Sequence, residues 1–178
     1  MTASRPTTTR EALQRAIARR RRRQTKARWW RFGILAGAVL AADQVTKEII
    51  RATLERGERH EVVAGFSISY VTNEGIAFGL FPGRQAAVAI LTVIALCAIA
   101  VALAGLVARN ATVAAGAGLL AGGSIGNLID RLVHGAVTDF LDPARWPAFN
   151  IADIGIVAGA ALIVLGLMRD AEEAEEPG

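Results

Sequence analysis

Cysteine and histidine are almost missing from this chain, and their scarcity excludes several kinds of site. Cys97 is the only cysteine among 178 residues, so the chain can form neither an intramolecular disulfide nor a thiolate metal site. The two histidines, His60 and His134, lie far apart and lack the His-Glu-x-x-His spacing of a zinc hydrolase. Ser124 has no histidine within its own segment, so we expect no Ser-His-Asp triad. The sequence therefore predicts neither a metal ion nor a cofactor.

Net positive charge is concentrated at the N-terminus. Residues 1–31 carry eleven Lys and Arg and one acid, whereas the rest carries nine Lys and Arg against fifteen Asp and Glu. The net charge of +4 thus reflects a basic arm, and we expect membrane lipids rather than nucleic acid as its partner. The composition predicts that residues 1–28 are a disordered cytoplasmic arm and that residues 169–178 are an acidic cytoplasmic tail.

Long runs without charge predict helices that cross a membrane. Crossing the hydrocarbon core takes about 20 apolar residues. A weaker first span must continue through Asp43 and Lys47 to reach that length. The predicted domain covers residues 29–168, and its spans lie at about 29–50, 85–108, 110–131 and 151–168. We therefore expect an all-α membrane protein with four transmembrane helices.

Basic residues orient these helices, because Lys and Arg favour the cytoplasmic side. The arm places the N-terminus in the cytoplasm, and four spans return the C-terminus there. We expect the first helix to be retained, because no small-residue cleavage site ends it. The segment 51–83 then lies outside, where apolar side chains alternate from Phe66 to Tyr70. This alternation predicts a small extracytoplasmic β-sheet, or cradle, between helices 1 and 2.

Small residues recur at four-residue spacing along the predicted spans. Such spacing lets helix backbones approach closely in lipid. The positions are Gly33, Gly37 and Ala41, then Gly118, Gly122 and Gly126, then Gly155 and Gly159. We expect them to draw the polar helix ends together.

Carboxylates in apolar sequence are the most informative feature of the chain. An ionisable group at membrane depth costs about 2.5–3.5 kcal/mol, so it is rarely left there without a role. The spacing of Asp43 and Lys47 predicts an ion pair on one helix face, and Arg131 is the expected partner of Asp130. Asn150 lies three residues before Asp153, the spacing of a capping box at the start of a helix. Threading by charge brings four carboxylates to one membrane face: Asp43, Asp130, Asp139 and Asp153.

Asp139 and Asp153 are the candidates for catalysis. Asp139 has no basic neighbour in sequence, and Asp153 lies at a predicted helix start. If they meet in a water-excluded site, they share a proton and titrate as a pair. The ionised member can take a proton from water, while the protonated member donates one to the substrate. The pattern predicts acid–base peptide hydrolysis without an acyl-enzyme.

Five sequence blocks, taken together and in this order, resemble the lipoprotein signal peptidases, also called signal peptidase II. The blocks cover residues 43–47, 73–79, 122–131, 137–140 and 149–153. The resemblance implies an aspartyl endopeptidase of the bacterial cytoplasmic membrane, with its active site near the outer interface. Its substrates would be diacylglyceryl-modified prolipoproteins, cut just before the lipidated lipobox cysteine. A monomer suffices for such a function.

The family's functional residues fall on positions in these blocks. Its catalytic pair corresponds to Asp139 and Asp153. Its substrate-binding or supporting positions correspond to Asp43, Lys47, Asn73, Gly75, Asn127, Asp130, Arg131, Asn150 and Ala152. The family's cradle and lid-like segment would correspond to residues 51–83.

Two other functions remain open at this level. A proton- or cation-coupled transporter also uses intramembrane carboxylates, but it needs a polar path that reaches the inner face. A non-enzymatic scaffold could use the same polar groups only to hold helices together. The peptidase hypothesis instead requires Asp139 and Asp153 to lie at one site.

Overall fold

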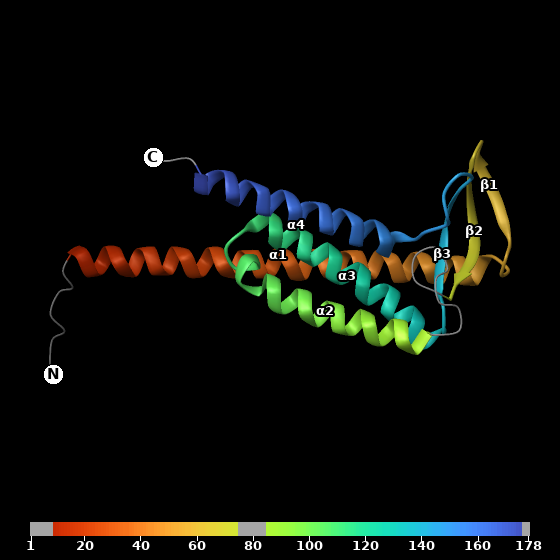
Figure 1. Cartoon of the computed structure of the whole chain (residues 1–178), viewed down its shortest axis with the longest axis horizontal. Coiled ribbons are helices and arrows are strands. Elements are labelled where there is room, and N and C mark those ends of the chain that lie inside the picture. Colours follow the sequence, from red (N-terminus) through yellow and green to blue (C-terminus); the bar gives the residue numbers. More distant parts are fainter. Residues whose placement is uncertain (1–8, 75–84, 176–178) are drawn as a thin grey trace.

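The computed structural model describes residues 9–74 and 85–175 of the chain. Its elements are α1 (Thr9–Thr53), β1 (Arg59–Val63), β2 (Phe66–Asn73), α2 (Gln85–Val107), α3 (Ala111–Val133), β3 (Val137–Pro143) and α4 (Ile151–Glu175). The helices lie side by side, and the sheet covers one end of the bundle (Figure 1). The first turn of α1 and the last turn of α4 lie at the opposite end.

Three of the helices are long and apolar enough to cross a membrane, judged by length and composition. Their membrane-length stretches are Ile90–Val107, Ala111–Val133 and Ile151–Glu172. The apolar stretch of α1 is interrupted by Asp43, Lys47 and Glu48, and α1 does not qualify. The helical fold is confirmed, whereas the fourth membrane span, over residues 29–50, stays a prediction.

The N-terminal arm corrects one expectation. Residues 9–28 were expected to be disordered, but they form the first part of α1, a continuous helix of 45 residues. Residues 9–28 contain no Pro or Gly and are rich in Ala and Arg, which favour helix. Thr25 and Arg28 also donate hydrogen bonds to the carbonyl oxygen of Ala108, just after α2. The arm projects well past the other helices (Figure 1).

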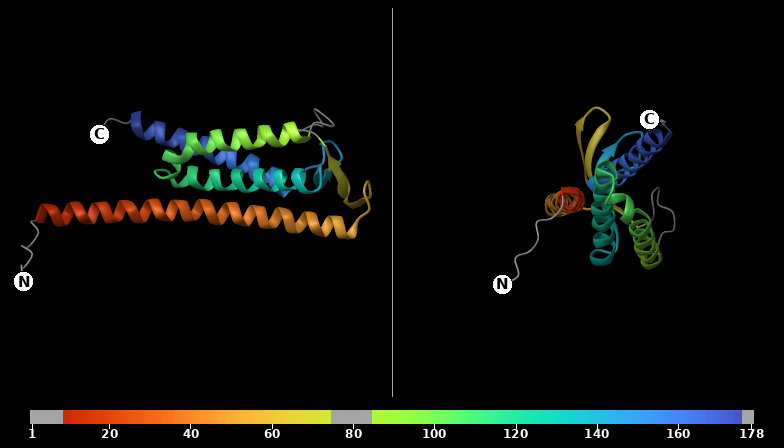
Figure 2. Two further views of the ribbon diagram at one scale, coloured as in Figure 1. Left: turned by 90° about the horizontal axis from the view of Figure 1, so that it is seen from below. Right: turned by 90° about the vertical axis from the view of Figure 1, so that its left-hand side faces the viewer.

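α3 lies at the centre of the bundle, between α1 and α4 and against α2 (Figure 2). Glycines allow this close packing. Gly118 and Gly122 approach the carbonyl oxygens of Phe32 and Ala36 in α1 so closely that a Cβ would overlap them. Gly116 meets the backbone of α4 in the same way. The predicted close approach is therefore confirmed for these helices.

The same prediction is wrong for Gly33 and Gly37, where an added Cβ would meet no atom within 4 Å and would point into open space. This difference gives a matched pair of variants. Gly122→Ala should destabilise the protein by about 1–3 kcal/mol, because α1 must move away. Gly37→Ala should leave stability unchanged or raise it by up to about 1 kcal/mol, since Ala favours helix. Thermal unfolding in detergent measures both; equal effects would contradict the packing of α3 against α1.

The sheet is antiparallel, with strand order β1-β2-β3. It was expected to lie wholly between helices 1 and 2, but its third strand comes from the connection between α3 and α4. This strand carries Val137, Thr138 and Phe140, residue types that favour strands. The register pairs Val71 with Asp139. The sheet thus carries a predicted catalytic residue to the end of the helix bundle.

Candidate active site

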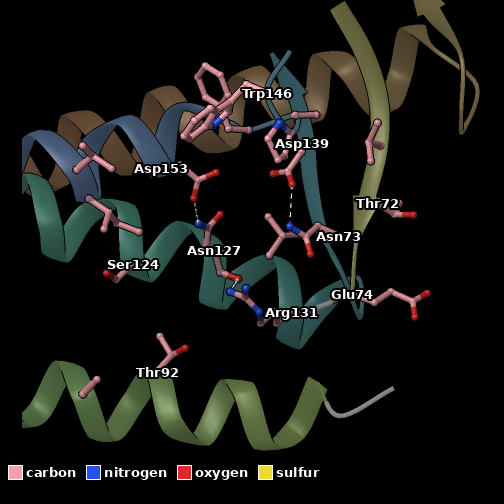
Figure 3. Close-up of a pocket in the computed structure, with 18 of the residues that line it drawn as sticks. Thr72, Asn73, Glu74, Thr92, Ser124, Asn127, Arg131, Asp139, Trp146 and Asp153 are labelled. Carbon is pink, nitrogen blue, oxygen red and sulfur yellow. Dashed lines mark hydrogen bonds between the residues drawn. The ribbon is translucent and has the colours of Figure 1, made fainter. Parts of the chain in front are cut away.

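A pocket of about 870 Å³ opens at the sheet end of the bundle. Its walls come from the ends of β2 and β3, from α2 and α3, and from the start of α4. Figure 3 shows the carboxylates of Asp139 and Asp153 directed into this pocket from two different elements. The predicted residues that line it are Asn73, Asn127, Arg131, Asp139 and Asp153.

Asp153 is held by the first turn of α4. The backbone N–H of Asp153 donates to Asn150 Oδ1 at 3.0 Å, and the N–H of Asn150 donates to Asp153 Oδ2 at 3.2 Å. This reciprocal pair confirms the predicted capping box. Asn127 Nδ2 donates to the other carboxylate oxygen at 2.8 Å. These donors and the helix N-terminus stabilise a negative charge on Asp153.

Asp139 lies in β3 and is more deeply buried than Asp153, with only 2% of its surface exposed. Its oxygens accept hydrogen bonds from Asn73 Nδ2 at 3.0 Å and from Asn150 Nδ2 at 2.6 Å. Burial raises the pKa of Asp139 to about 7; the two hydrogen bonds oppose this rise, and the charge of Asp153 adds to it. Asp139 can therefore hold a proton near neutral pH.

Asn150 connects the two aspartates. Its side chain contacts Asp139 through Nδ2, while its backbone and Oδ1 hold Asp153. Asn150 Nδ2 also lies 3.2 Å from Asn127 Oδ1, and Asn127 in turn contacts Asp153. Asp139 in β3 and Asp153 in α4 are thus held at one site by the side chains of Asn150 and Asn127, which contact each other.

A buried ionic cluster lies behind the pocket. Lys47 is fully buried, and its Nζ lies 2.8 Å from Asp43 Oδ2 and 3.1 Å from Asp130 Oδ2. It also donates to Asn127 Oδ1 at 2.9 Å. The predicted pair of Asp43 and Lys47 is therefore confirmed. A buried ammonium requires such partners, because an unpaired charge in the interior is strongly unfavourable.

This cluster holds the backbone next to each pocket aspartate. Asp43 Oδ1 accepts from the N–H of Ala152, the residue before Asp153, at 2.9 Å. Asp130 Oδ2 accepts from the N–H of Thr138, the residue before Asp139, also at 2.9 Å. The same Lys47 ammonium joins the two supporting carboxylates. It therefore links the start of α4 to β3.

One predicted partnership is wrong. Arg131 was expected to pair with Asp130, but Asp130 pairs with Lys47 and with Arg51 Nη1, at 3.4 Å. Consecutive residues of a helix point in different directions, so Asp130 faces α1 while Arg131 faces the pocket. Arg131 Nη1 donates to the carbonyl oxygen of Asn127 at 3.2 Å. It places a positive charge within electrostatic range of Asp153 and Asp139, and also of Asp130.

Two supporting residues were not predicted. Arg51 Nη1 donates to Thr138 Oγ1 at 2.8 Å, in addition to its contact with Asp130. Gln44 Nε2 donates to Asp43 Oδ2 at 3.1 Å. Arg51 lies four residues after Lys47, so the helical period that identified the first ion pair could have found it too.

Other chemistry at this pocket has less support. Ser124 lines the pocket, and residues 122–126 match the Gly-x-Ser-x-Gly pattern. In serine hydrolases that pattern forms a sharp strand-to-helix turn, whereas here it lies inside α3. Across residues 9–74 and 85–175, no three His, Cys, Asp or Glu side chains form a group that could hold a metal ion. Gly75, a predicted supporting residue, lies outside the described residues.

The raised pKa of Asp139 predicts a dependence of stability on pH. A carboxyl that binds its proton more tightly when folded stabilises the fold at low pH. That stabilisation is lost as the pH rises from the ordinary pKa of 3.8 through about 7. A pKa difference of this size corresponds to a change of up to about 4 kcal/mol in the free energy of unfolding. Between pH 4 and 8, Asp139→Asn should therefore lose less stability than the unsubstituted protein in thermal unfolding. Parallel curves for the two proteins would contradict the burial of this carboxyl.

Comparisons with known proteins agree on one family. The family model described as signal peptidase (SPase) II matches residues 35–169. A lipoprotein signal peptidase of Pelotomaculum thermopropionicum is 39% identical over 144 residues, covering 80% of this chain and 95% of that protein. One from Staphylococcus aureus is 34% identical over 148 residues, covering 80% and 91%. A solved structure of a bacterial membrane enzyme is similar with a TM-score of 0.71 and 33% identity, covering 82% of this chain and 92% of the other.

Proposed function

Because this chain belongs to the signal peptidase II family, we propose that it removes signal peptides from lipoproteins, with Asp139 and Asp153 as its catalytic pair. One observation carries this proposal: the side chain of Asn150 contacts Asp139 while its cap holds Asp153, and both carboxylates line one pocket. The family makes the chain a peptidase, and the pocket supports the aspartic mechanism proposed for it.

The surroundings of Asp139 and Asp153 differ, and they favour different catalytic roles for the two side chains. Asp153 acts as the base, because its carboxylate lies at the N-terminus of α4 and accepts hydrogen bonds from the Asn150 N–H and from the Asn127 side chain. It takes a proton from water as the water oxygen attacks the scissile carbonyl carbon. Asp139 is the acid, because burial keeps it protonated near neutral pH, and it donates its proton to the carbonyl oxygen.

The collapse of the tetrahedral intermediate returns both groups to their starting states. Asp153 gives its acquired proton to the leaving nitrogen, and Asp139 recovers a proton from a hydroxyl of the intermediate. The C–N bond then breaks to give a carboxylic acid and an amine. No covalent bond to the enzyme forms, so no side-chain nucleophile is needed.

The arrangement of the bundle supports a location for the chemistry. The pocket lies at the end opposite the basic arm (Figure 1). Lys and Arg favour the cytoplasmic side, so both termini lie in the cytoplasm and the pocket lies near the outer interface of a bacterial cytoplasmic membrane. In this topology α1 is the first of four spans, and the charges of Asp43 and Lys47 are paired within the protein.

The substrate follows from this position. The scissile bond of a prolipoprotein lies near the outer interface, just before the cysteine that carries the diacylglyceryl group. Apolar side chains such as Leu96, Ile99 and Val157 line the pocket beside the carboxylates. They offer an apolar surface next to the reacting groups.

The lipid dependence of cleavage tests this proposal. Purified protein should cleave diacylglyceryl-modified prolipoprotein at least about tenfold faster than the unmodified precursor, since anchoring the scissile bond removes an entropic barrier. A coupled assay with and without the diacylglyceryl-transfer step measures both rates. Equal rates would contradict the proposed substrate class, and no cleavage of either precursor would contradict the proposed function.

A further inference from the structure

The cytoplasmic end of α1 carries a second hollow, remote from the pocket. This groove of about 690 Å³ lies between α1 and α3. The α1 residues recur at three- and four-residue spacing and therefore form one helix face. Its lining consists of Ala27, Trp30, Arg31, Ile34, Leu35 and Ala115.

The groove combines an apolar floor with one available cation. Ile34 is 63% exposed and Trp30 is 62% exposed, so protein side chains do not cover them. Arg31 is also exposed, and within the described part of the chain it makes no hydrogen bond or ion pair. Arg28, one turn earlier, is instead occupied by the carbonyl oxygen of Ala108. Arg31 is therefore the guanidinium at the groove that remains free to bind a ligand.

The depth of the groove matches a membrane interface, an argument that rests on the proposed function. At 1.5 Å per residue, α1 spans about 33 Å from Arg28 to Ile50. A bilayer's hydrocarbon core is about 30 Å thick. If the pocket end lies at the outer interface, Trp30 and Arg31 lie at the inner one, where Trp side chains are enriched.

We propose that this groove binds one anionic phospholipid of the cytoplasmic leaflet. The phosphate pairs with the Arg31 guanidinium, whose fork geometry suits two phosphate oxygens. One acyl chain lies over Ile34, Leu35 and Ala115. The Trp30 ring packs at the level of the glycerol backbone, where its apolar body and polar N–H are both satisfied. Basic pockets between membrane helices on this side bind anionic lipid headgroups in the same way.

A general attraction between the basic arm and the membrane is the alternative that an experiment must exclude. Arg10 lies about 31 Å from Arg31 along the helix, at 1.5 Å per residue. That separation exceeds the Debye length of about 8 Å at physiological salt. Arg10→Gln therefore removes the same charge without touching the groove, and it is the matched control for Arg31→Gln.

Quenching of Trp30 fluorescence by brominated acyl chains tests the site. The full chain carrying Trp29→Phe and Trp146→Phe retains Trp30 as its only tryptophan. It is placed in nanodiscs with increasing fractions of brominated phosphatidylglycerol or brominated phosphatidylcholine. Half-maximal quenching should require about fivefold less phosphatidylglycerol, as expected for one added cationic contact of about 1 kcal/mol.

The variants separate the possible outcomes. Arg31→Gln should abolish the preference for phosphatidylglycerol, Arg10→Gln should retain it, and Ala115→Leu should weaken quenching by filling the groove. If Ala115→Leu does not fold, Ala27→Leu fills the groove from α1. Equal quenching by both lipids, or equal losses in Arg31→Gln and Arg10→Gln, would overturn the site. The quenching experiment measures lipid binding and not cleavage. A negative result in it therefore says nothing against the proposed peptidase activity, and a protein that fails to cleave can still be tested for lipid binding.

Discussion

Asp139→Asn and Asp153→Asn should each lower the turnover of lipidated prolipoprotein by about 10²–10⁴-fold, the usual contribution of a positioned acid or base. An amide at position 153 cannot take a proton from water. An amide at position 139 cannot deliver one to the carbonyl oxygen. Each change nearly preserves side-chain size, so substrate should still bind. Single-turnover cleavage by purified variants, with substrate binding measured separately, gives the rates.

Asp142→Asn is the matched control, because Asp142 lies on the same strand as Asp139. Its carboxylate pairs with Arg59 at 3.2 Å and does not line the pocket. We expect its loss to change turnover by less than about threefold, since partly exposed ion pairs contribute little. If Asp153→Asn retains turnover within about tenfold of the unsubstituted protein, the pair is not the catalytic machinery.

Lys47→Met should lower the free energy of unfolding by about 3–5 kcal/mol, the usual result of removing one partner from a buried ion pair. The Met side chain fills similar space but leaves Asp43 without its cation, and Asp130 keeps only Arg51. Because Lys47 joins the two carboxylates that hold the backbone beside Asp139 and Asp153, turnover should fall with kcat affected more than KM. Thermal unfolding and cleavage kinetics of the same preparation measure both effects.

Two further variants separate positioning from a general loss of structure. Glu48→Gln removes an exposed charge from the neighbouring position of α1 and should leave stability unchanged within about 0.5 kcal/mol. Adding Asp43→Asn to Lys47→Met removes the negative charge that Lys47 no longer compensates. The Asn side chain keeps an oxygen that can accept the hydrogen bond from the Ala152 N–H. This double variant should recover part of the lost stability. A Lys47→Met protein as stable as the unsubstituted one would contradict the role of the ionic cluster.

Sequence reasoning succeeded where the partners are close in the chain. The pair of Asp43 and Lys47 follows from a spacing of four on a helix, and the cap formed by Asn150 and Asp153 follows from a spacing of three. Both depend only on local helix geometry, which the residue types already determine. The five sequence blocks also identified the family, because each block is a short continuous run of residues.

The features that were missed depend on tertiary contacts or on weak local signals. The charged partners of Asp130, Lys47 and Arg51, lie on α1, some 80 residues away in the chain, and nothing in the local sequence identifies them. The third strand was missed because Val137–Pro143 is a short segment between two helices, and its pairing with β2 is visible only in three dimensions. The helical arm was missed because its charge was weighed more than the helix propensity of Ala and Arg.

The protonation state of Asp139 tests the central claim most directly. Infrared titration of the purified protein, compared with Asp139→Asn, can follow the carbonyl signal of this one carboxyl. We predict a protonated carboxyl at pH 6 that ionises near pH 7, is absent from Asp139→Asn, and ionises at lower pH in Asp153→Asn, where the like charge is gone. An Asp139 that ionises near pH 4, and is unaffected by Asp153, would leave no acid to protonate the scissile carbonyl and would contradict the account.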